Sequence, residues 1–362
     1  MIVEKILPVK YPDLTCYPYY ANALSIISAS EADYTPWMLS NFIQLSCHFE
    51  PDTLKVDFFQ PWISWVPYCC PLIDVQIINK DVIHNLYNFN IISFVEQTIS
   101  SGYYIQMKVN HKFLSVSKSS YKQSDYAHEL LIYGFNRVQE TFEVADNFDG
   151  KYEFKRCSYK EFEEAYNHLA LFNTDYYEKV LLLRPITETN FSFDLLRVTD
   201  SLKDYLAGRD TRIRDDQSQT WAGGLTLGIK IYEEIPKYLL MLLEGTAKND
   251  IRLFHVLWEQ KKLMAVRIKY MEGRGIINKK SIYEEYLELE KKCLIIRNLI
   301  LKYDINHDQQ IIHRVMREVE EFPKIESALL SELLDQIYHN TVRSESIVLG
   351  NKNDLKLNWS LI

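Results

Sequence analysis

The pattern of apolar and polar residues changes near residue 187 of this 362-residue chain. Before that point, short runs of alternating, β-branched and aromatic residues are typical of strands. We predict strands at 103–109, 129–135, 142–148 and 179–185. After that point, apolar residues recur at the helical period, and we predict helices at 192–207, 226–243, 249–271, 281–302, 307–321 and 324–341. The pattern therefore predicts an α+β protein whose second part is all helical.

A few residues mark where individual helices begin or break. Ser158 and Glu161 have the spacing of a capping box, which predicts that a helix follows Ser158. Ser281 and Glu284 have the same spacing and predict another helix start. Pro236 should end or kink its helix, because proline lacks the N–H that the helix interior needs.

The same change of pattern divides the chain into domains. The length suits two domains, since single domains have roughly 100–200 residues. We expect a mixed domain over residues 1–187 and a helical domain over residues 188–345. Residues 346–362 should form a loosely ordered tail.

Charge and composition exclude several classes of protein. The chain has 49 acidic and 41 basic residues, and its net charge of −8 disfavours binding to the phosphates of nucleic acid. Glu4 and Pro8 stand where a signal peptide would need an apolar core, and no run approaches the ~18 apolar residues of a membrane helix. The six cysteines form no disulfide framework in so long a chain. We expect a soluble cytoplasmic protein with reduced thiols and no membrane attachment.

Cys16 is the first candidate for chemistry. The sequence predicts a helix that begins at about Cys16, with Thr15 as its N-cap and Pro18 in its first turn. The positive end of a helix favours the thiolate, which is the form that attacks a carbonyl carbon. A small buried cysteine that only packs in the core explains the same sequence equally well. Cys16 is therefore a candidate nucleophile whose role depends on its partners.

His128 and Asp146 lie on two predicted strands that form a hairpin. If the turn is centred near Val138, His128 is paired with Phe148, and Asp146 lies on the same face one diagonal away. Diagonal neighbours are about 7–8 Å apart, so an imidazole and a carboxylate can meet there. A register shift of one residue would place Asn147 in that position instead. We favour Asp146 as the group that orients the imidazole and stabilises its protonated form.

The order of Cys16, His128 and Asp146 along the chain is that of the papain-like enzymes. Three segments resemble the bacteriocin-leader-peptidase branch of the papain superfamily. The helical second half resembles, in architecture more than in motif, the butirosin-type acyltransferases and the amide synthase of closthioamide biosynthesis. The three segments are 11–24, 103–114 and 127–166, and the last contains AHELLIYGFN, FEVADNF and CSYKEFEEAY.

This resemblance implies a papain-like catalytic domain over residues 1–187 and a helical domain over residues 188–345 that covers its cleft. It also implies an ATP-independent acyltransferase of natural-product biosynthesis, in which Cys16 takes an acyl group from a carrier-protein thioester and passes it to a small amine or diamine. The phosphopantetheine arm arrives on the carrier protein, so no cofactor is expected. A cysteine peptidase or amidase with the same triad is one alternative. A binding protein that keeps the fold without catalysis is another.

One difference from these peptidases concerns the oxyanion hole. The peptidases place a Gln shortly before the cysteine, whereas residues 8–15 of this chain contain none. Tyr11 and Thr15 are candidates for the missing donor and for contacts with substrate. An amide substrate demands more stabilisation of the oxyanion than a thioester does, so the difference favours acyl transfer over peptide cleavage.

Two pairs of small residues complete the candidates. Gly223 and Gly224 would allow the backbone to approach a substrate closely, because glycine has no Cβ. Cys69 and Cys70 have no His or Cys partner nearby at a metal-binding spacing, so we interpret them as loop residues. We expect no metal site.

Overall fold

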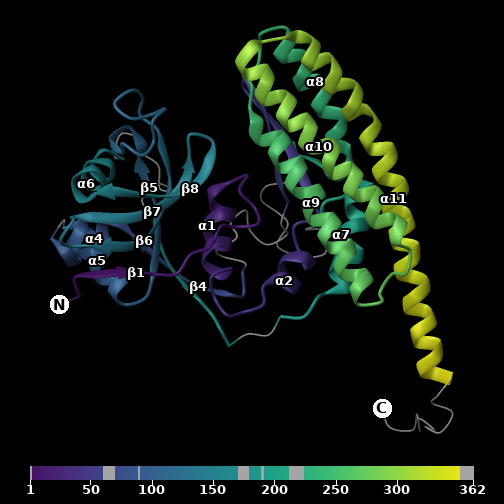
Figure 1. The fold of residues 1–362 in the computed structure, drawn as a ribbon, viewed down its shortest axis with the longest axis horizontal. Coiled ribbons are helices and arrows are strands. Elements are labelled where there is room, and N and C mark those ends of the chain that lie inside the picture. Colours follow the sequence, from purple (N-terminus) through teal and green to yellow (C-terminus); the bar gives the residue numbers. More distant parts are fainter. Residues whose placement is uncertain are drawn as a thin grey trace. The chain divides into compact units, whose positions relative to one another are not determined.

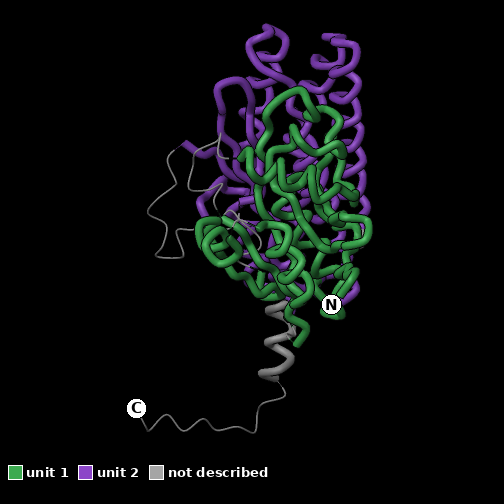
Figure 2. The backbone as a smooth tube through the Cα atoms, turned by 90° about the vertical axis from the view of Figure 1, so that its left-hand side faces the viewer, with its two compact units in different colours: residues 1–34, 62–191 green, residues 35–61, 192–362 purple. Residues whose placement is uncertain are grey.

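The structure is a computed structural model that describes residues 2–59, 70–88, 90–169, 179–188, 191–211 and 224–350. The chain forms two compact units, which Figure 2 distinguishes by colour. Unit 1 comprises residues 1–34 and 62–191, and unit 2 comprises residues 35–61 and 192–362. Figure 1 labels the helices of both units and several strands of unit 1.

Unit 1 combines an antiparallel sheet with helices on both of its faces. Among the described residues, the sheet has seven strands. The elements of unit 1 are β1 (Glu4–Ile6), α1 (Pro18–Ile27), β4 (Ile73–Asn79), α4 (Lys80–Tyr87), α5 (Ile91–Ser100), β5 (Tyr104–Asn110), the 3₁₀ helix η1 (His111–Phe113), β6 (Ala127–Asn136), β7 (Thr141–Phe148), β8 (Lys151–Ser158), α6 (Tyr159–Asn167) and β9 (Lys179–Pro185).

The strands of this sheet follow the order β4-β9-β5-β6-β7-β8, and neighbours are antiparallel. β1 pairs with residues 134–136 of β6, beyond the stretch 127–132 with which β5 pairs. Gly134 permits this close approach, because a Cβ there would lie 3.0 Å from the carbonyl oxygen of Lys5. The β6–β7 hairpin is therefore held by other strands on both sides.

The two faces of β7 look toward different helices, since successive residues of a strand point to opposite faces. Tyr152 of β8 is paired with Asn147 of β7 and donates a hydrogen bond to Asn22 of α1 at 2.9 Å. Phe142 of β7 lies on the other face and packs against Phe162 of α6, with ring centroids 5.0 Å apart. α1 and α6 therefore cover opposite faces of this part of the sheet.

The predicted strands of unit 1 are confirmed to within two residues at each end, as β5, β6, β7 and β9. The capping box of Ser158 and Glu161 is also present, at the start of α6. The second predicted capping box is wrong, because α10 of unit 2 begins at Lys280 and Ser281 lies inside it. Its N-cap, Lys279, makes no side-chain capping bond.

The predicted start of α1 is also wrong. The helix begins at Pro18 rather than at Cys16, and its N-cap is Tyr17 rather than Thr15. Proline is favoured at the first helical position, because the N–H that it lacks would have no partner there. Cys16 therefore precedes the N-cap of α1.

Unit 2 contains the helical C-terminal region of the chain and a small antiparallel sheet of order β10-β2-β3. The expected tail at 346–362 begins inside α11, and residues 351–362 lie outside the described part of the chain. The elements of unit 2 are α2 (Thr35–Ser40), β2 (Leu45–Glu50), β3 (Thr53–Phe58), α7 (Leu195–Ala207), β10 (Thr226–Leu227), the 3₁₀ helix η4 (Gly228–Lys230), α8 (Ile231–Leu243), α9 (Ile251–Gly273), α10 (Lys280–Asn306) and α11 (Gln309–Gly350).

Two prolines lie inside helices of unit 2. The helices predicted at 307–321 and 324–341 are one helix, α11, which continues through Pro323. Pro236 likewise lies inside α8 and does not end it. Packing on both sides of each proline offsets the hydrogen bond that the proline removes. In α11 the buried residues around the proline are Val315, Val319, Phe322, Glu326, Leu329, Leu330 and Leu333.

Residues 35–61 belong to unit 2, which differs from the expected division of the chain at residue 187. Arg267 of α9 donates hydrogen bonds to the carbonyl oxygens of Leu39 and Asn41, both at 2.6 Å. β2, which lies in the same segment, pairs with β10. The alternating pattern of β2 and β3 predicts strands but does not identify the elements against which they pack.

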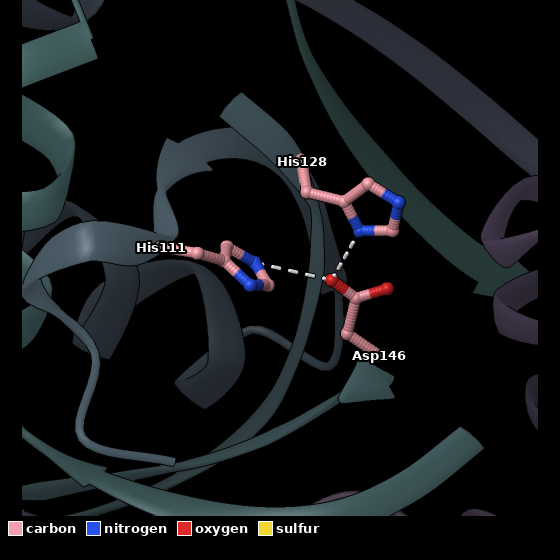
Figure 3. A group of neighbouring side chains, drawn as sticks. All are labelled: His111, His128 and Asp146. Atoms are coloured by element: carbon pink, nitrogen blue, oxygen red, sulfur yellow. Dashed lines mark hydrogen bonds and ion pairs between the residues drawn. The ribbon is translucent and has the colours of Figure 1, made fainter. Parts of the chain in front are cut away.

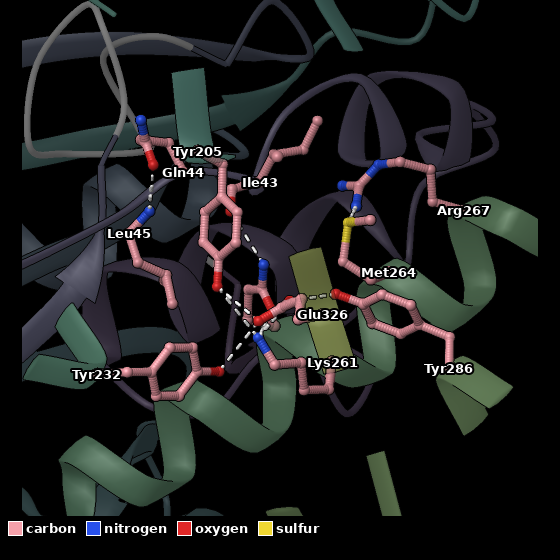
Figure 4. Close-up of polar contacts among 11 residues, drawn as sticks. Ile43, Gln44, Leu45, Tyr205, Tyr232, Lys261, Met264, Arg267, Tyr286 and Glu326 are labelled. Carbon is pink, nitrogen blue, oxygen red and sulfur yellow. Dashed lines mark hydrogen bonds and ion pairs between the residues drawn. The ribbon is translucent and has the colours of Figure 1, made fainter. Parts of the chain in front are cut away.

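A fully buried ion pair joins α9 and α11 (Figure 4). Lys261 donates to Oε1 of Glu326 at 2.7 Å, and neither side chain is exposed. Tyr205 and Tyr232 donate to Oε2 of the same carboxylate at 2.9 and 3.2 Å, and Tyr286 donates to Oε1. Each carboxylate oxygen therefore has two donors, which offset much of the cost of burying the charge.

Candidate active site

The β6–β7 hairpin brings His128 and Asp146 into contact. Nδ1 of His128 lies 2.7 Å from Oδ2 of Asp146, as Figure 3 shows. Leu131 is paired with Ala145 in this hairpin, and the same register continued toward its open end sets His128 opposite Phe148. The predicted contact is therefore confirmed, and the register beyond the bulge at Ile132 and Gly134 agrees with the predicted pairing.

Asp146, and not Asn147, is the residue that faces the imidazole. Oδ1 of Asp146 accepts the backbone N–H of Asn147 at 2.7 Å, which leaves Oδ2 directed at His128. The side chain of Asn147 points to the opposite face of the strand. There its Nδ2 donates a hydrogen bond to the carbonyl oxygen of Thr15 at 3.1 Å. Asn147 thus holds the segment that leads into Cys16.

Cys16 lies in the short segment between Thr15 and the start of α1, and it is buried. The hydrogen bond from Asn147 ties this segment to the open end of the hairpin, where β6 begins and β7 ends. His128 and Asp146 lie at that same end. The structure therefore brings the Cys16 segment and the His–Asp pair to one end of β7.

The charges of the pair stabilise each other. Burial acts to lower the pKa of His128, but the carboxylate of Asp146 outweighs it and raises this pKa above its usual value of 6.5. Burial acts to raise the pKa of Asp146, and the imidazoles of His128 and His111 outweigh it and hold this pKa at about 2. An imidazolium formed at His128 by proton transfer is therefore stabilised by a carboxylate that stays ionised.

Three other cysteines are protected from reaction by their surroundings. Burial raises the pKa of Cys47 and of Cys293 to about 12. Burial also raises the pKa of Cys157, which lies on β8. At neutral pH these three side chains are thiols, and a thiol is a poor nucleophile compared with its thiolate. They provide an internal comparison for Cys16.

We expect iodoacetamide to modify Cys16 before Cys47, Cys157 and Cys293. The reason is that Cys16 lies next to the positive end of α1, at the same end of β7 as the His–Asp pair, whereas burial keeps the other three protonated. Peptide mass mapping over a time course measures the order of modification. Replacing His128 by alanine should slow the reaction at Cys16.

The remaining two cysteines, Cys69 and Cys70, provide the result that would contradict this prediction. Cys70 is buried, and Cys69 lies outside the described residues. Modification of either one before Cys16 would argue that Cys16 is an ordinary core residue.

His111 is a second imidazole at Asp146, and the sequence analysis missed it. The residue follows β5 directly, its side chain is buried, and its Nε2 lies 3.2 Å from Oδ2 of Asp146 (Figure 3). No motif or spacing links His111 to His128 in the sequence. Val109 is paired with His128 across β5 and β6, and this pairing carries His111 to the site. His111 could have been identified from the sequence only if the pairing of β5 with β6 had been known.

The remaining candidates have different surroundings. Tyr11 is exposed and packs edge-on against Tyr152, with ring centroids 6.2 Å apart, while Thr15 contributes its carbonyl oxygen as described. Gly224 belongs to unit 2 and has a φ of +90°, a conformation that favours glycine. Gly223 lies outside the described residues. The contacts of these residues with a substrate stay predictions.

None of the helices in the described part of the chain combines the length and the apolar composition needed to cross a membrane.

Comparisons with known proteins do not identify the family of this chain. No model of a known protein family matches the chain, and no curated protein matches it either. What the chain does is therefore inferred from the geometry of the site and from the motifs of its sequence.

Proposed function

We propose that this chain is a papain-like cysteine acyltransferase that forms amide bonds. The observation that carries the proposal is the 2.7 Å contact between His128 and the buried carboxylate of Asp146. The segment that leads into Cys16 is tied to the same hairpin by Asn147. A nucleophile, a base and a group that orients the base are the parts of a nucleophilic triad. A papain-like fold for unit 1, residues 1–34 and 62–191, is part of this proposal.

In the first half-reaction, Nε2 of His128 accepts the proton of the Cys16 thiol. The thiolate sulfur forms a bond to the carbonyl carbon of an acyl thioester, and the carbonyl electron pair moves onto oxygen. The bond to the sulfur of the donor then breaks, and that sulfur leaves with the proton from His128. Asp146 fixes the imidazole and stabilises its protonated form, as the pKa shifts of this pair support.

In the second half-reaction, a neutral amine attacks the carbonyl carbon of the acyl group on Cys16. His128 accepts a proton from the amine nitrogen and returns it to the Cys16 sulfur when the carbon–sulfur bond breaks. The products are an amide and the free enzyme. ATP is not consumed, because the thioester already carries the activation. Orientation of the amine, worth up to ~7–11 kcal/mol, favours amide formation over hydrolysis.

The proposed donor is a phosphopantetheine thioester on an acyl or peptidyl carrier protein, and the acceptor is a small amine or diamine. Residues 8–15 offer no Gln to the oxyanion hole, and a thioester depends less on that help than an amide does. The net charge of −8 is compatible with a cationic acceptor. Both features support acyl transfer to an amine in natural-product biosynthesis.

Purified protein should form amide from an acyl thioester and a diamine in the absence of ATP. Because the amine and water compete for one acyl-enzyme, the amide product should rise with amine concentration until hydrolysis is a minor path. Intact-mass spectrometry before amine is added should detect an acyl adduct, and Cys16→Ser should abolish it. Chromatography of the amide and of the free acid measures both products.

Cys157→Ser is the matched control, because it also replaces a buried cysteine of unit 1. This variant should retain the adduct on Cys16. Hydrolysis that no amine affects, diamines and aminoglycosides included, would contradict the acyltransferase. Cleavage of a peptide under those conditions would identify the cysteine peptidase, which uses the same residues.

A further inference from the structure

His111 makes an unusual set of contacts for a buried histidine. Its side chain is 1% exposed, and its Nδ1 lies 3.2 Å from the hydroxyl of Ser117. Its Nε2 points at Oδ2 of Asp146 from 3.2 Å but has no hydrogen-bond partner of acceptable geometry in the described structure. A buried polar nitrogen without a well-aligned hydrogen bond is costly, and native proteins rarely retain one without a reason.

Three atoms that can bind a metal converge at this point. Nε2 of His111, Nδ1 of His128 and Oδ2 of Asp146 all lie within 4.8 Å of one another. Oδ2 of Asp146 is 2.7 Å from Nδ1 of His128 and 3.2 Å from Nε2 of His111. Two ligands of a tetrahedral zinc ion with bonds of about 2.0–2.1 Å stand roughly 3.4 Å apart. The carboxylate oxygen is therefore within about 1 Å of the spacing that a zinc ion needs from each nitrogen, and the two nitrogens, which lie within 4.8 Å of each other, move closer together when the ion binds.

The outer contacts suit a metal site as well. The hydroxyl of Ser117 can accept the proton of Nδ1 of His111, which leaves the lone pair of Nε2 free to bind a metal. The backbone N–H of Asn147 holds Oδ1 of Asp146, which leaves Oδ2 as the ligand atom. Each of these two ligands is therefore oriented by a second group, as in established metal sites.

We propose that His111, His128 and Asp146 bind a divalent cation of the zinc type, and that the bound ion switches off the base of the active site. Two imidazoles and one carboxylate are the ligands that such ions share, whereas magnesium and calcium prefer oxygen alone. The sequence analysis predicted no metal site, because His111 was not among its candidate residues. Metal binding by these residues does not depend on the proposed function. The inhibition by the bound ion does rest on the proposed function.

Inhibition follows from the proton positions on His128. Without a metal, Nδ1 carries a proton toward Asp146, and Nε2 has the lone pair that accepts the proton of Cys16. A metal ion bound to Nδ1 takes the lone pair of that nitrogen, so the neutral ring must carry its proton on Nε2. The ring then has no lone pair for the Cys16 proton. The ion also occupies Oδ2 of Asp146, which no longer orients the imidazole.

Zinc binding is measured on the full chain carrying Cys16→Ser, so that the thiol contributes nothing. Protein freed of metal is titrated with zinc sulfate against a chromophoric chelator. We expect one zinc ion per chain, and a loss of affinity of roughly tenfold or more when His111 or His128 is also replaced by glutamine. Ser117→Ala, which keeps all three ligands, should weaken binding by about tenfold.

His48→Gln is the matched control. His48 also faces a carboxylate, with Nε2 3.7 Å from Oε1 of Glu50, but it belongs to unit 2. This variant should bind zinc as tightly as its parent. Circular dichroism of each metal-free variant checks that it is folded, and Ser117→Ala provides the test if His111→Gln is not. An absence of zinc binding, or equal affinity in Ser117→Ala and in every folded ligand variant, would overturn the site.

The inhibitory role has a separate measurement. Zinc should reduce amide formation by the wild-type chain, and a chelator should restore it. The zinc concentration for half inhibition should rise roughly tenfold or more in Ser117→Ala, relative to that variant's own metal-free activity. Zinc binding without inhibition would overturn the switch and leave the site. An enzyme that forms amide but binds no zinc would overturn the site and leave the proposed function.

Discussion

Replacing Cys16 or His128 by alanine should lower kcat/KM for amide formation by a factor on the order of 10⁴ or more. The double variant should be little worse than either single one, because the nucleophile and its base act as a unit. His168→Ala is the matched control, since His168 is an exposed histidine of unit 1 whose Nδ1 lies 2.8 Å from the backbone oxygen of Glu164 and whose ring stacks on Phe113. Steady-state kinetics in metal-free buffer measures the effect.

Asp146→Ala should lower kcat/KM by roughly 10²–10⁴, less than the loss of either reacting group. Asp146 contacts the base at 2.7 Å from Nδ1 and is not itself a reacting group, so its removal leaves the nucleophile and the base in the chain. Asn147→Ala should be milder still, because Asn147 contacts the backbone of Thr15 and not the imidazole. A silent Asp146→Ala beside a severe Asn147→Ala would mean that Asn147 is the orienting group.

Lys261→Met should lower the free energy of unfolding by about 3–5 kcal/mol, the largest effect on stability that we expect. The substitution keeps the length of the side chain but leaves the carboxylate of Glu326 in the core without its cation. Adding Glu326→Gln should recover part of the loss, because the amide is neutral and still accepts hydrogen bonds from the surrounding tyrosines. Urea unfolding followed by circular dichroism measures the free energies.

Lys237→Met is the control for this effect. Lys237 pairs with Glu234 at 2.9 Å, also within unit 2, but its side chain is 61% exposed. Breaking a pair that solvent screens should cost less than about 1 kcal/mol. A cost for Lys261→Met as small as that of this control would mean that Glu326 takes up a proton or that water enters the core.

The hairpin was predictable from the sequence because everything that defines it is local. A short turn connects two alternating strands, which predicts a hairpin with His128 and Asp146 near its open end. The turn pairs Asn136 with Thr141, and that register alone would set His128 opposite Asp149. The bulge between Ile132 and Gly134 shifts the register by one residue, which sets His128 opposite Phe148. Contact between His128 and Asp146 followed without knowledge of any other element.

Features that depend on distant parts of the chain could not be predicted in this way. His111 reaches the site through the pairing of β5 with β6, which no local pattern specifies. The assignment of residues 35–61 depends on Arg267, more than two hundred positions away. The start of α1 is set by Pro18, whose fixed φ suits the first helical position better than Cys16 does.

The membership of residues 35–61 in unit 2 has a consequence during protein synthesis. This segment leaves the ribosome about 190 residues before α9 begins to emerge. At roughly 5–20 residues per second, the wait is about 10–40 s. Until then the apolar face of β2 and β3, formed by side chains such as Leu45, Leu54 and Val56 that the finished protein buries, lacks its packing partner. The nascent chain therefore presents a binding site for a chaperone for most of its time on the ribosome.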